Sequence, residues 1–239
     1  MEMIILKIKQ PERVKNFFIG FSAIILYFVF TQLQGLPLVL LDIDIENLSQ
    51  TFIVWYSFFF TVVLIFILVF IYRKTLKSNW LDLKQNHQEY FKKYLKYWFL
   101  ALGIMMLSNF IILLIRPGSI AGNEEAVKDL FESVPIYTFI SAVFLAPFLE
   151  ELTFRLSFRY MFKNDWLFII SSGLVFGLMH IVGTYETVYD LLYLVPYSTP
   201  GIIFAYVLTK SKNIFVPIGL HFIHNGLLMS LQVFVLIFG

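Results

Sequence analysis

The sequence predicts an all-α protein, a polytopic membrane bundle of about seven transmembrane helices with a cytoplasmic N-terminus. Of its 239 residues, 59% are hydrophobic and only 14% are charged, whereas soluble domains carry about 25% charged residues. The mean hydropathy is +0.79. The apolar residues also gather in runs of about 20, the length that crosses a bilayer as a helix. These observations exclude an ordinary soluble domain.

Seven apolar runs are predicted to span the membrane. They lie at 17–41, 52–72, 95–115, 134–160, 166–183, 188–209 and 214–238. Gln32, Gln34 and Pro37 in the first run predict a helix that ends early, with 36–41 continuing along the interface. Cations precede this run as in a signal peptide, but no small-residue cleavage site follows, so we expect a retained helix. One membrane domain is predicted over 1–239, with helices 1–3 in 1–133 and helices 4–7 in 134–238.

The distribution of cations predicts the orientation. Sixteen of the 18 lysines and arginines fall within 7–15, 73–96, 155–163 and 209–213, and the two others are Arg116 and Lys128. Cytoplasmic loops carry such an excess.

The 73–96 segment interleaves lysines with Leu, Trp, Tyr and Phe residues. This pattern favours a basic amphipathic helix on the membrane surface over a solvated loop. Nucleic-acid binding is not expected, because the cations flank apolar runs rather than gather on a folded domain. The sequence has no cysteine, which excludes disulfides, thiol catalysis and thiolate ligation of a metal.

Polar clusters inside the apolar runs point to a site within the membrane, because ionisable groups in hydrocarbon are costly. The fourth run contains Glu150-Glu151-x-x-x-Arg155. Glu151 and Arg155 have the spacing and order of a helical ion pair, which leaves Glu150, about 100° around the helix, as the free carboxylate. Pro147 is expected to bend this helix. The alternative is an ordinary helix end at the membrane surface.

The fifth and seventh runs add histidines. Phe176 and His180 lie one helical turn apart, and His221, His224 and Asn225 share one face of the seventh helix. A lone histidine such as His180 is compatible with ordinary core packing, whereas three polar groups on one face are harder to explain in that way. We measured depth along each helix at 1.5 Å per residue from the charged residues at its predicted cytoplasmic end. By this measure Glu150, His180 and His221 can lie at a similar depth in the membrane.

These groups suit hydrolysis of an amide by water. Glu150 with His180 would hold and deprotonate water, while His221 and Asn225 would donate hydrogen bonds to the oxyanion. The sixth run contains Pro196 and Pro200, which predict a helix broken near its middle that serves as a gate or substrate cleft.

In this order and spacing, the three motifs resemble the CAAX protease and bacteriocin-processing (CPBP, or Abi) family of intramembrane proteases, which includes the type II CAAX prenyl endopeptidases. The resemblance covers 134–230. It implies that Glu150 activates water with His180, that His221 and Asn225 stabilise the oxyanion, and that Glu151 and Arg155 support the motif. Phe176 would pack beside the water site, and His224 is counted as a supporting residue.

The resemblance also bears on cofactors and substrates. Glu150, His180 and His221 could ligate zinc, but no His-Glu-x-x-His pair is present, so no cofactor is expected and a glutamate mechanism is favoured. The implied substrate is a membrane-associated peptide precursor, such as a pheromone or bacteriocin, or a lipidated protein tail. The short chain, rich in Phe, Ile and Lys and without cysteine, is typical of a cell-membrane protein of Gram-positive bacteria.

Two other classes stay open at this point. A non-catalytic scaffold or bacteriocin-immunity protein could keep the same polar layer for stability. A proton-coupled transporter could use Glu150, Glu151 and the histidines as a relay, although such proteins usually contain repeated halves, and none is detected in this sequence.

Overall fold

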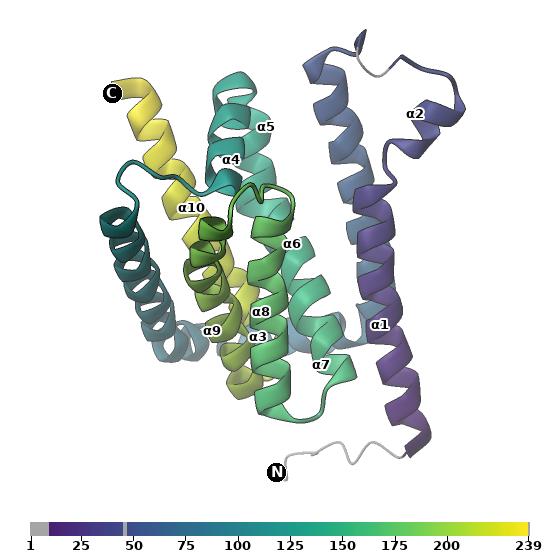
Figure 1. Ribbon diagram of the computed structural model, residues 1–239. Coiled ribbons are helices and arrows are strands. Elements are labelled where there is room, and N and C mark those ends of the chain that lie inside the picture. Colours follow the sequence, from purple (N-terminus) through teal and green to yellow (C-terminus); the bar gives the residue numbers. More distant parts are fainter. Residues whose placement is uncertain (1–9, 45–46, 239) are drawn as a thin grey trace.

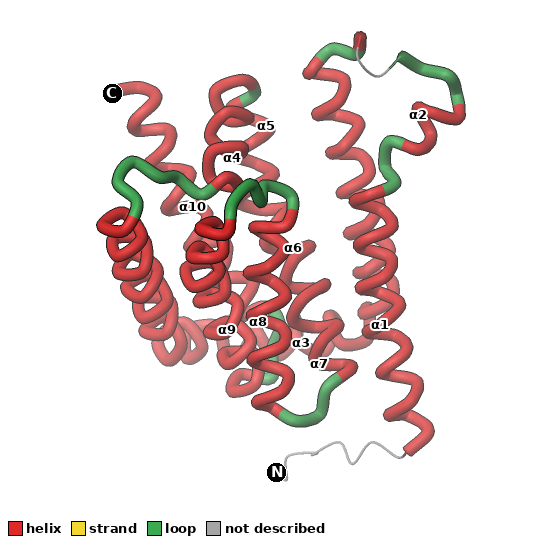
Figure 2. The backbone as a smooth tube through the Cα atoms, viewed as in Figure 1, coloured by secondary structure: helices red, strands yellow, loops and turns green. Residues whose placement is uncertain are grey.

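A computed structural model describes residues 10–44 and 47–238, and within these ranges the regular structure is entirely helical (Figures 1 and 2). The elements are α1 Gln10–Gln32, α2 Leu36–Leu40, α3 Gln50–Ile115, α4 Gly122–Ser133, α5 Pro135–Ile140, η2 Ser141–Leu145, α6 Ala146–Glu150, η3 Glu151–Leu156, α7 Ser157–Met161, α8 Asp165–Val182, η4 Val188–Tyr193, α9 Leu194–Ser211 and α10 Phe215–Phe238. Six helical stretches in the described ranges are long and apolar enough to cross a membrane. The all-helical membrane fold is thus confirmed.

The longest helix, α3, contains two of the seven predicted spans. Its 66 residues would measure about 100 Å if straight, three times the thickness of the hydrocarbon core. Figure 1 shows that α3 descends beside α1, crosses one end of the bundle and rises on the far side. The cytoplasmic orientation stays a prediction, and Lys7 and Lys9, on which it partly rests, lie outside the described residues.

The crossing part of α3 corresponds to the predicted amphipathic segment, and it is helical throughout. Polar contacts attach it to the turn between α9 and α10. Asn213 donates from Nδ2 to Asn79 O at 2.8 Å and to Asp82 Oδ2 at 2.7 Å, and the Ile214 N–H donates to Asn79 Oδ1 at 2.9 Å. The segment is therefore a docked helix rather than a solvated loop.

The predicted 134–160 helix is present but irregular. It alternates between α-helical turns and two π-helical turns, η2 and η3. In η2 the Ala146 N–H bonds to Ser141 O, five residues earlier. The same register pairs Ala142 O with Pro147, which has no N–H to donate. The predicted disturbance at Pro147 thus takes the form of π-type turns, which are frequent at functional sites.

Side chains from neighbouring helices bond to carbonyls in both irregular turns. Asn225 on α10 donates from Nδ2 to Ala142 O at 2.8 Å. Ser172 on α8 donates from Oγ to Phe154 O at 2.6 Å. Since unpaired buried carbonyls are costly, these bonds fix α8 and α10 against the irregular helix.

Two other expectations need correction. The predicted break in the sixth span is wrong, because α9 continues through Pro200; Pro196 lies in its first turn, where a missing N–H costs little. The loop after Arg116 contains the 12-residue helix α4, which was not predicted. Glu124 and Glu125 in its first turn favour this helix through the helix dipole.

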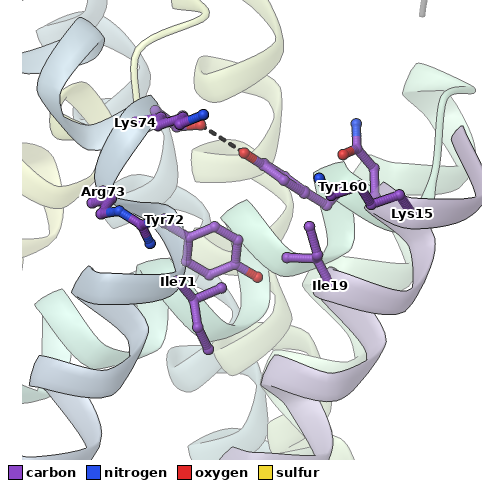
Figure 3. Close-up of a pocket in the computed structure, with 9 residues that line it drawn as sticks. Lys15, Ile19, Ile71, Tyr72, Arg73, Lys74 and Tyr160 are labelled. Carbon is purple, nitrogen blue, oxygen red and sulfur yellow. Dashed lines mark hydrogen bonds between the residues drawn. The ribbon is translucent and has the colours of Figure 1, made fainter. Parts of the chain in front are cut away.

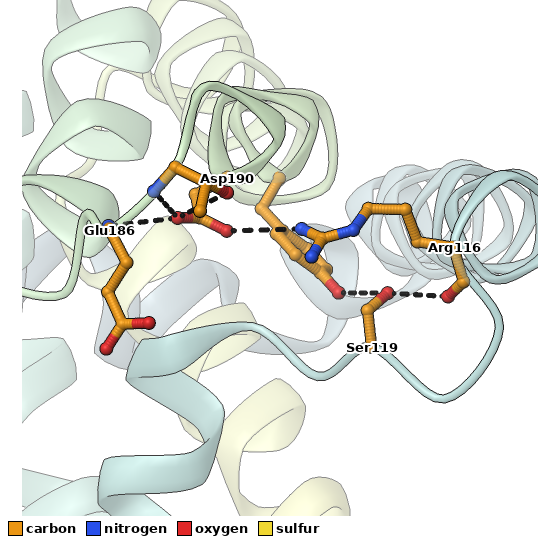
Figure 4. Close-up of polar contacts among 6 residues, drawn as sticks. Arg116, Ser119, Glu186 and Asp190 are labelled. Atoms are coloured by element: carbon orange, nitrogen blue, oxygen red, sulfur yellow. Dashed lines mark hydrogen bonds and ion pairs between the residues drawn. The ribbon is translucent and has the colours of Figure 1, made fainter.

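The end of the bundle opposite the α3 crossing is held by polar contacts between the loop after α3 and η4 (Figure 4). Arg116 pairs with Asp190 at 3.7 Å. Tyr193 donates its hydroxyl to Ser119 Oγ at 3.0 Å. These contacts fix the start of α9, which carries residues beside the candidate site.

Helices α8 and α9 approach closely because glycine faces small residues. A Cβ added to Gly177 would lie 2.8 Å from the Ser198 backbone nitrogen and would also meet the Ser198 hydroxyl. Gly201 on α9 lies against Gly173 in the same way. Small residues at such spacing allow the backbones of membrane helices to touch.

Gly177→Ala is therefore expected to lower the free energy of unfolding by about 1–3 kcal/mol, since the added methyl group overpacks the contact. Thermal unfolding of the purified protein in detergent measures the effect. Gly103→Ala is the matched control, because a Cβ added to Gly103 would meet no atom within 4 Å and alanine favours a helix. Equal unfolding temperatures for the two variants would contradict the close contact.

Candidate active site

The centre of the polar cluster is an ion pair with no exposure to solvent. Arg155 Nε lies 3.3 Å from Glu151 Oε2, and both side chains are 0% exposed. The geometry is that of a charge contact rather than a hydrogen bond, and within the described residues none of the three guanidinium nitrogens has a hydrogen-bond partner. Buried charges persist only when they are compensated, so this pair constrains everything packed around it.

His221 joins the pair to the second carboxylate. Its Nδ1 lies 2.9 Å from Glu151 Oε1, and its Nε2 lies 3.7 Å from Glu150 Oε2. An ionised carboxylate can only accept hydrogen bonds, which assigns a proton to Nδ1. Glu150 keeps 20% of its side chain exposed, whereas Glu151 is fully buried. The two neighbouring glutamates therefore differ in role: Glu151 orients His221, and Glu150 is accessible.

Phe176 organises the cluster from α8. The Arg155 guanidinium lies 4.1 Å from the centroid of its ring, a cation–π contact in an apolar setting. The rings of His180 and His221 lie 4.5 Å and 5.9 Å from the same ring. Phe176 is thus the packing residue that the two histidines share.

His180 lies at the edge of this cluster. Its Nδ1 is 2.9 Å from Phe176 O, and its ring stacks on Tyr197 at 4.9 Å with a 25° interplanar angle. Among the described residues, Nε2 of His180 has no hydrogen-bond partner, and the histidine in contact with Glu150 is His221. Tyr197 was missed by sequence reasoning, since no motif includes it.

The remaining predicted residues on α10 take different positions. Asn225 uses its amide to bond Ala142 O. His224 is 4% exposed, and its Nδ1 has no hydrogen-bond partner within the described ranges. Asn225 therefore touches the backbone of the irregular helix, while the preceding residue, His224, is buried.

The sequence offers Glu150, His180 and His221 as possible zinc ligands. In the part of the chain that the structure describes, no three His, Asp or Glu side chains converge as metal ligands, and zinc would need donors at about 2.0–2.2 Å. The set considered for zinc, Glu150, His180 and His221, is not gathered to such a point.

The region that contains these residues is similar to known proteins. Residues 132–227 match the family model described as "Type II CAAX prenyl endopeptidase Rce1-like". All the residues of the three motifs lie inside this stretch. This stretch, 96 of the 239 residues, is similar to the Rce1-like family. The resemblance read from the motifs is thereby confirmed.

Two curated relatives match this chain. "Putative membrane peptidase YdiL" of Bacillus subtilis (strain 168) is 29% identical over 113 residues, which cover 46% of this chain and 43% of the relative. "UPF0177 protein YvdC" of Lactococcus lactis subsp. lactis (strain IL1403) is 25% identical over 132 residues, which cover 54% of this chain and 48% of the relative. The chain spans less than half the length of both relatives, and no solved structure matches.

Removal of the buried cation tests the role of the ion pair. Arg155→Leu leaves the Glu151 carboxylate buried beside an apolar side chain, and we expect a loss of about 3–5 kcal/mol in the free energy of unfolding. The double variant Glu151→Gln/Arg155→Leu carries no unpaired charge and should lose clearly less. Chemical unfolding in detergent measures both. A double variant less stable than Arg155→Leu would contradict the pairing.

Proposed function

We propose that this protein is an intramembrane endopeptidase that uses Glu150 to activate water against a peptide bond of a membrane-associated substrate. The observation that carries the proposal is the environment of Glu150. It is a partly exposed carboxylate, 3.7 Å from a histidine that a fully buried glutamate orients. A carboxylate beside an oriented imidazole is the arrangement that general acid–base hydrolysis requires.

In the proposed reaction, Glu150 takes a proton from water while the water oxygen attacks the carbonyl carbon of the substrate. The free Nε2 of His180 accepts a hydrogen bond from the same water. The electron pair of the carbonyl moves to oxygen, giving an oxyanion. When the C–N bond breaks, Glu150 returns its proton to the leaving amine. The cycle restores the carboxylate and needs no cofactor.

The oxyanion needs donors, and His221 with Asn225 are proposed for this role. Glu151 Oε1 accepts a hydrogen bond from His221 Nδ1 and so orients the imidazole ring. The proposed role requires that Nε2 of His221, which faces the Glu150 side of the site, carry a proton. Asn225 Nδ2 donates to Ala142 O, and its second N–H is proposed to donate to the oxyanion.

The proposed substrate class is a peptide precursor or a lipidated protein tail at the membrane. The description of the matching family names prenyl endopeptidases, and one relative is named as a membrane peptidase. Both relatives come from Gram-positive bacteria, where maturation of secreted peptides, or immunity to them, would be the corresponding role.

Cleavage by site variants tests the proposal. Glu150→Gln, His180→Ala and His221→Ala should each lower kcat for cleavage of a membrane-peptide library by about 100-fold or more, since each removes a proposed acid–base or oxyanion group. Glu89→Gln and His87→Ala are matched controls on the exposed side of α3, and they should cleave like the unmodified protein. Full activity of Glu150→Gln would overturn the mechanism and favour the scaffold alternative.

A chelator separates the glutamate mechanism from zinc catalysis. We expect cleavage to survive prolonged incubation with EDTA or 1,10-phenanthroline, because Glu150 rather than a metal is proposed to activate the water. Activity that is lost with chelator and restored by zinc would contradict this part of the proposal. Elemental analysis of the active protein provides an independent measurement.

A further inference from the structure

A cavity of about 330 Å³ lies between α1, α3 and α7 and shares no residue with the candidate active site (Figure 3). Its lining consists of Lys15, Asn16, Ile19, Ile71, Tyr72, Arg73, Lys74, Thr75 and Tyr160. Figure 3 shows these side chains arranged around the space, with Tyr160 between the α1 and α3 walls. None of the motifs of the Rce1-like region explains this cavity.

The lining is strongly basic. Lys15, Arg73 and Lys74 contribute three cations, and no acidic residue lines the cavity. Arg73 is held by Phe70, since Nη1 donates to Phe70 O at 2.7 Å and the guanidinium lies 4.3 Å from the Phe70 ring centroid. Within the described ranges neither Lys15 nor Lys74 forms an ion pair, and both are exposed. The cavity therefore presents uncompensated positive charge that attracts an anion.

The position of the cavity along the helices places it at the membrane boundary. Lys15 stands just before the apolar part of α1, and Arg73 follows directly after the apolar run 52–72 of α3. Cations at such boundaries lie at the level of lipid headgroups. Ile19 and Ile71 line the cavity about one turn or less deeper into these apolar runs.

Hydroxyl groups complete the polar part of the lining. Tyr160 and Thr75 share a hydrogen bond of 2.6 Å between their hydroxyl oxygens. Tyr72 and Ser157 share another of 2.7 Å. Both bonds join α3 to α7, so the wall on this side is fixed in shape. A ligand in the cavity would touch α1 on one side and this fixed wall on the other.

We propose that this cavity binds the phosphate headgroup of an anionic phospholipid. Lys15 and Lys74 contact the phosphate, Arg73 adds positive charge, and Ile19 and Ile71 contact the first part of the acyl chains. The bound lipid bridges α1 to α3 and α7. The combination of cations at headgroup level with apolar side chains beneath them distinguishes a lipid from a free anion, which would need only the cations.

The test measures lipid binding by the purified full chain and does not depend on cleavage. Native mass spectrometry in detergent, with added phosphatidylglycerol or phosphatidylcholine, gives the bound fraction for each lipid. The variant Lys15→Gln/Arg73→Gln/Lys74→Gln should bind phosphatidylglycerol about 10- to 100-fold more weakly, given the contribution expected from each cation. The control Lys92→Gln/Lys93→Gln/Lys96→Gln removes the same charge elsewhere on α3 and should keep the affinity.

Each outcome bears on the proposal. Selective phosphatidylglycerol binding that only the cavity variant loses supports the proposal. If the triple variant fails to fold, the single variant Lys15→Glu, at an exposed position on α1, should show the same loss of binding. Equal losses in the two triple variants would indicate non-specific charge and overturn it. Competition by glycerol 3-phosphate at the same concentration as the lipid would replace the lipid with a free phosphate as the ligand, and would also overturn it.

Discussion

The buried contact between Glu151, Arg155 and His221 is the constraint on which the rest of the structure depends. Two full charges lie in an apolar layer with no exposure, and His221 extends the contact to α10. A carboxylate in such a place is tolerated only with its partners in position. The three partners come from η3 and α10, so these elements must meet at this depth. Phe176 then brings α8 to the same place through the Arg155 guanidinium.

The irregular backbone before the two glutamates arises at Pro147. Pro147 cannot donate a hydrogen bond, and the π-type turn beside it pairs Ala142 O with this missing donor. Asn225 supplies the donor from α10, just as Ser172 supplies one from α8 for Phe154 O. The backbone disturbance therefore strengthens the attachment between helices. These attachments lie on the helices that carry Glu150 and His221, and the proposed mechanism needs those two side chains in fixed relative positions.

Much of this could be predicted from the sequence, because apolar runs and helical spacing are local properties. The spans, the Glu151–Arg155 pair and the separation of Glu150 from that pair all follow from such spacing. Local patterns do not reveal which histidine meets which glutamate, since that depends on how helices pack. The structure brings His221 rather than His180 to Glu150, and it stacks His180 on Tyr197.

Three features escaped prediction for related reasons. The 73–96 segment continues α3 without interruption, because its residues favour a helix even outside the membrane. Pro200 does not break α9, because its buried small neighbours pack against the glycines of α8. Arg155 was counted with the flanking cations, yet it is fully buried. The outcomes at Pro200 and Arg155 are decided by tertiary packing rather than by local propensity.

A double-mutant cycle between Glu151 and His221 tests the central claim most directly. The free energies of unfolding of Glu151→Gln, His221→Ala and the double variant give the coupling between the two side chains. We predict a coupling of about 1 kcal/mol or more, while the control cycle of Glu151→Gln with His224→Ala should be additive within about 0.5 kcal/mol. Additive losses for Glu151 and His221 would contradict the account, because they would mean that the buried glutamate does not hold the histidine.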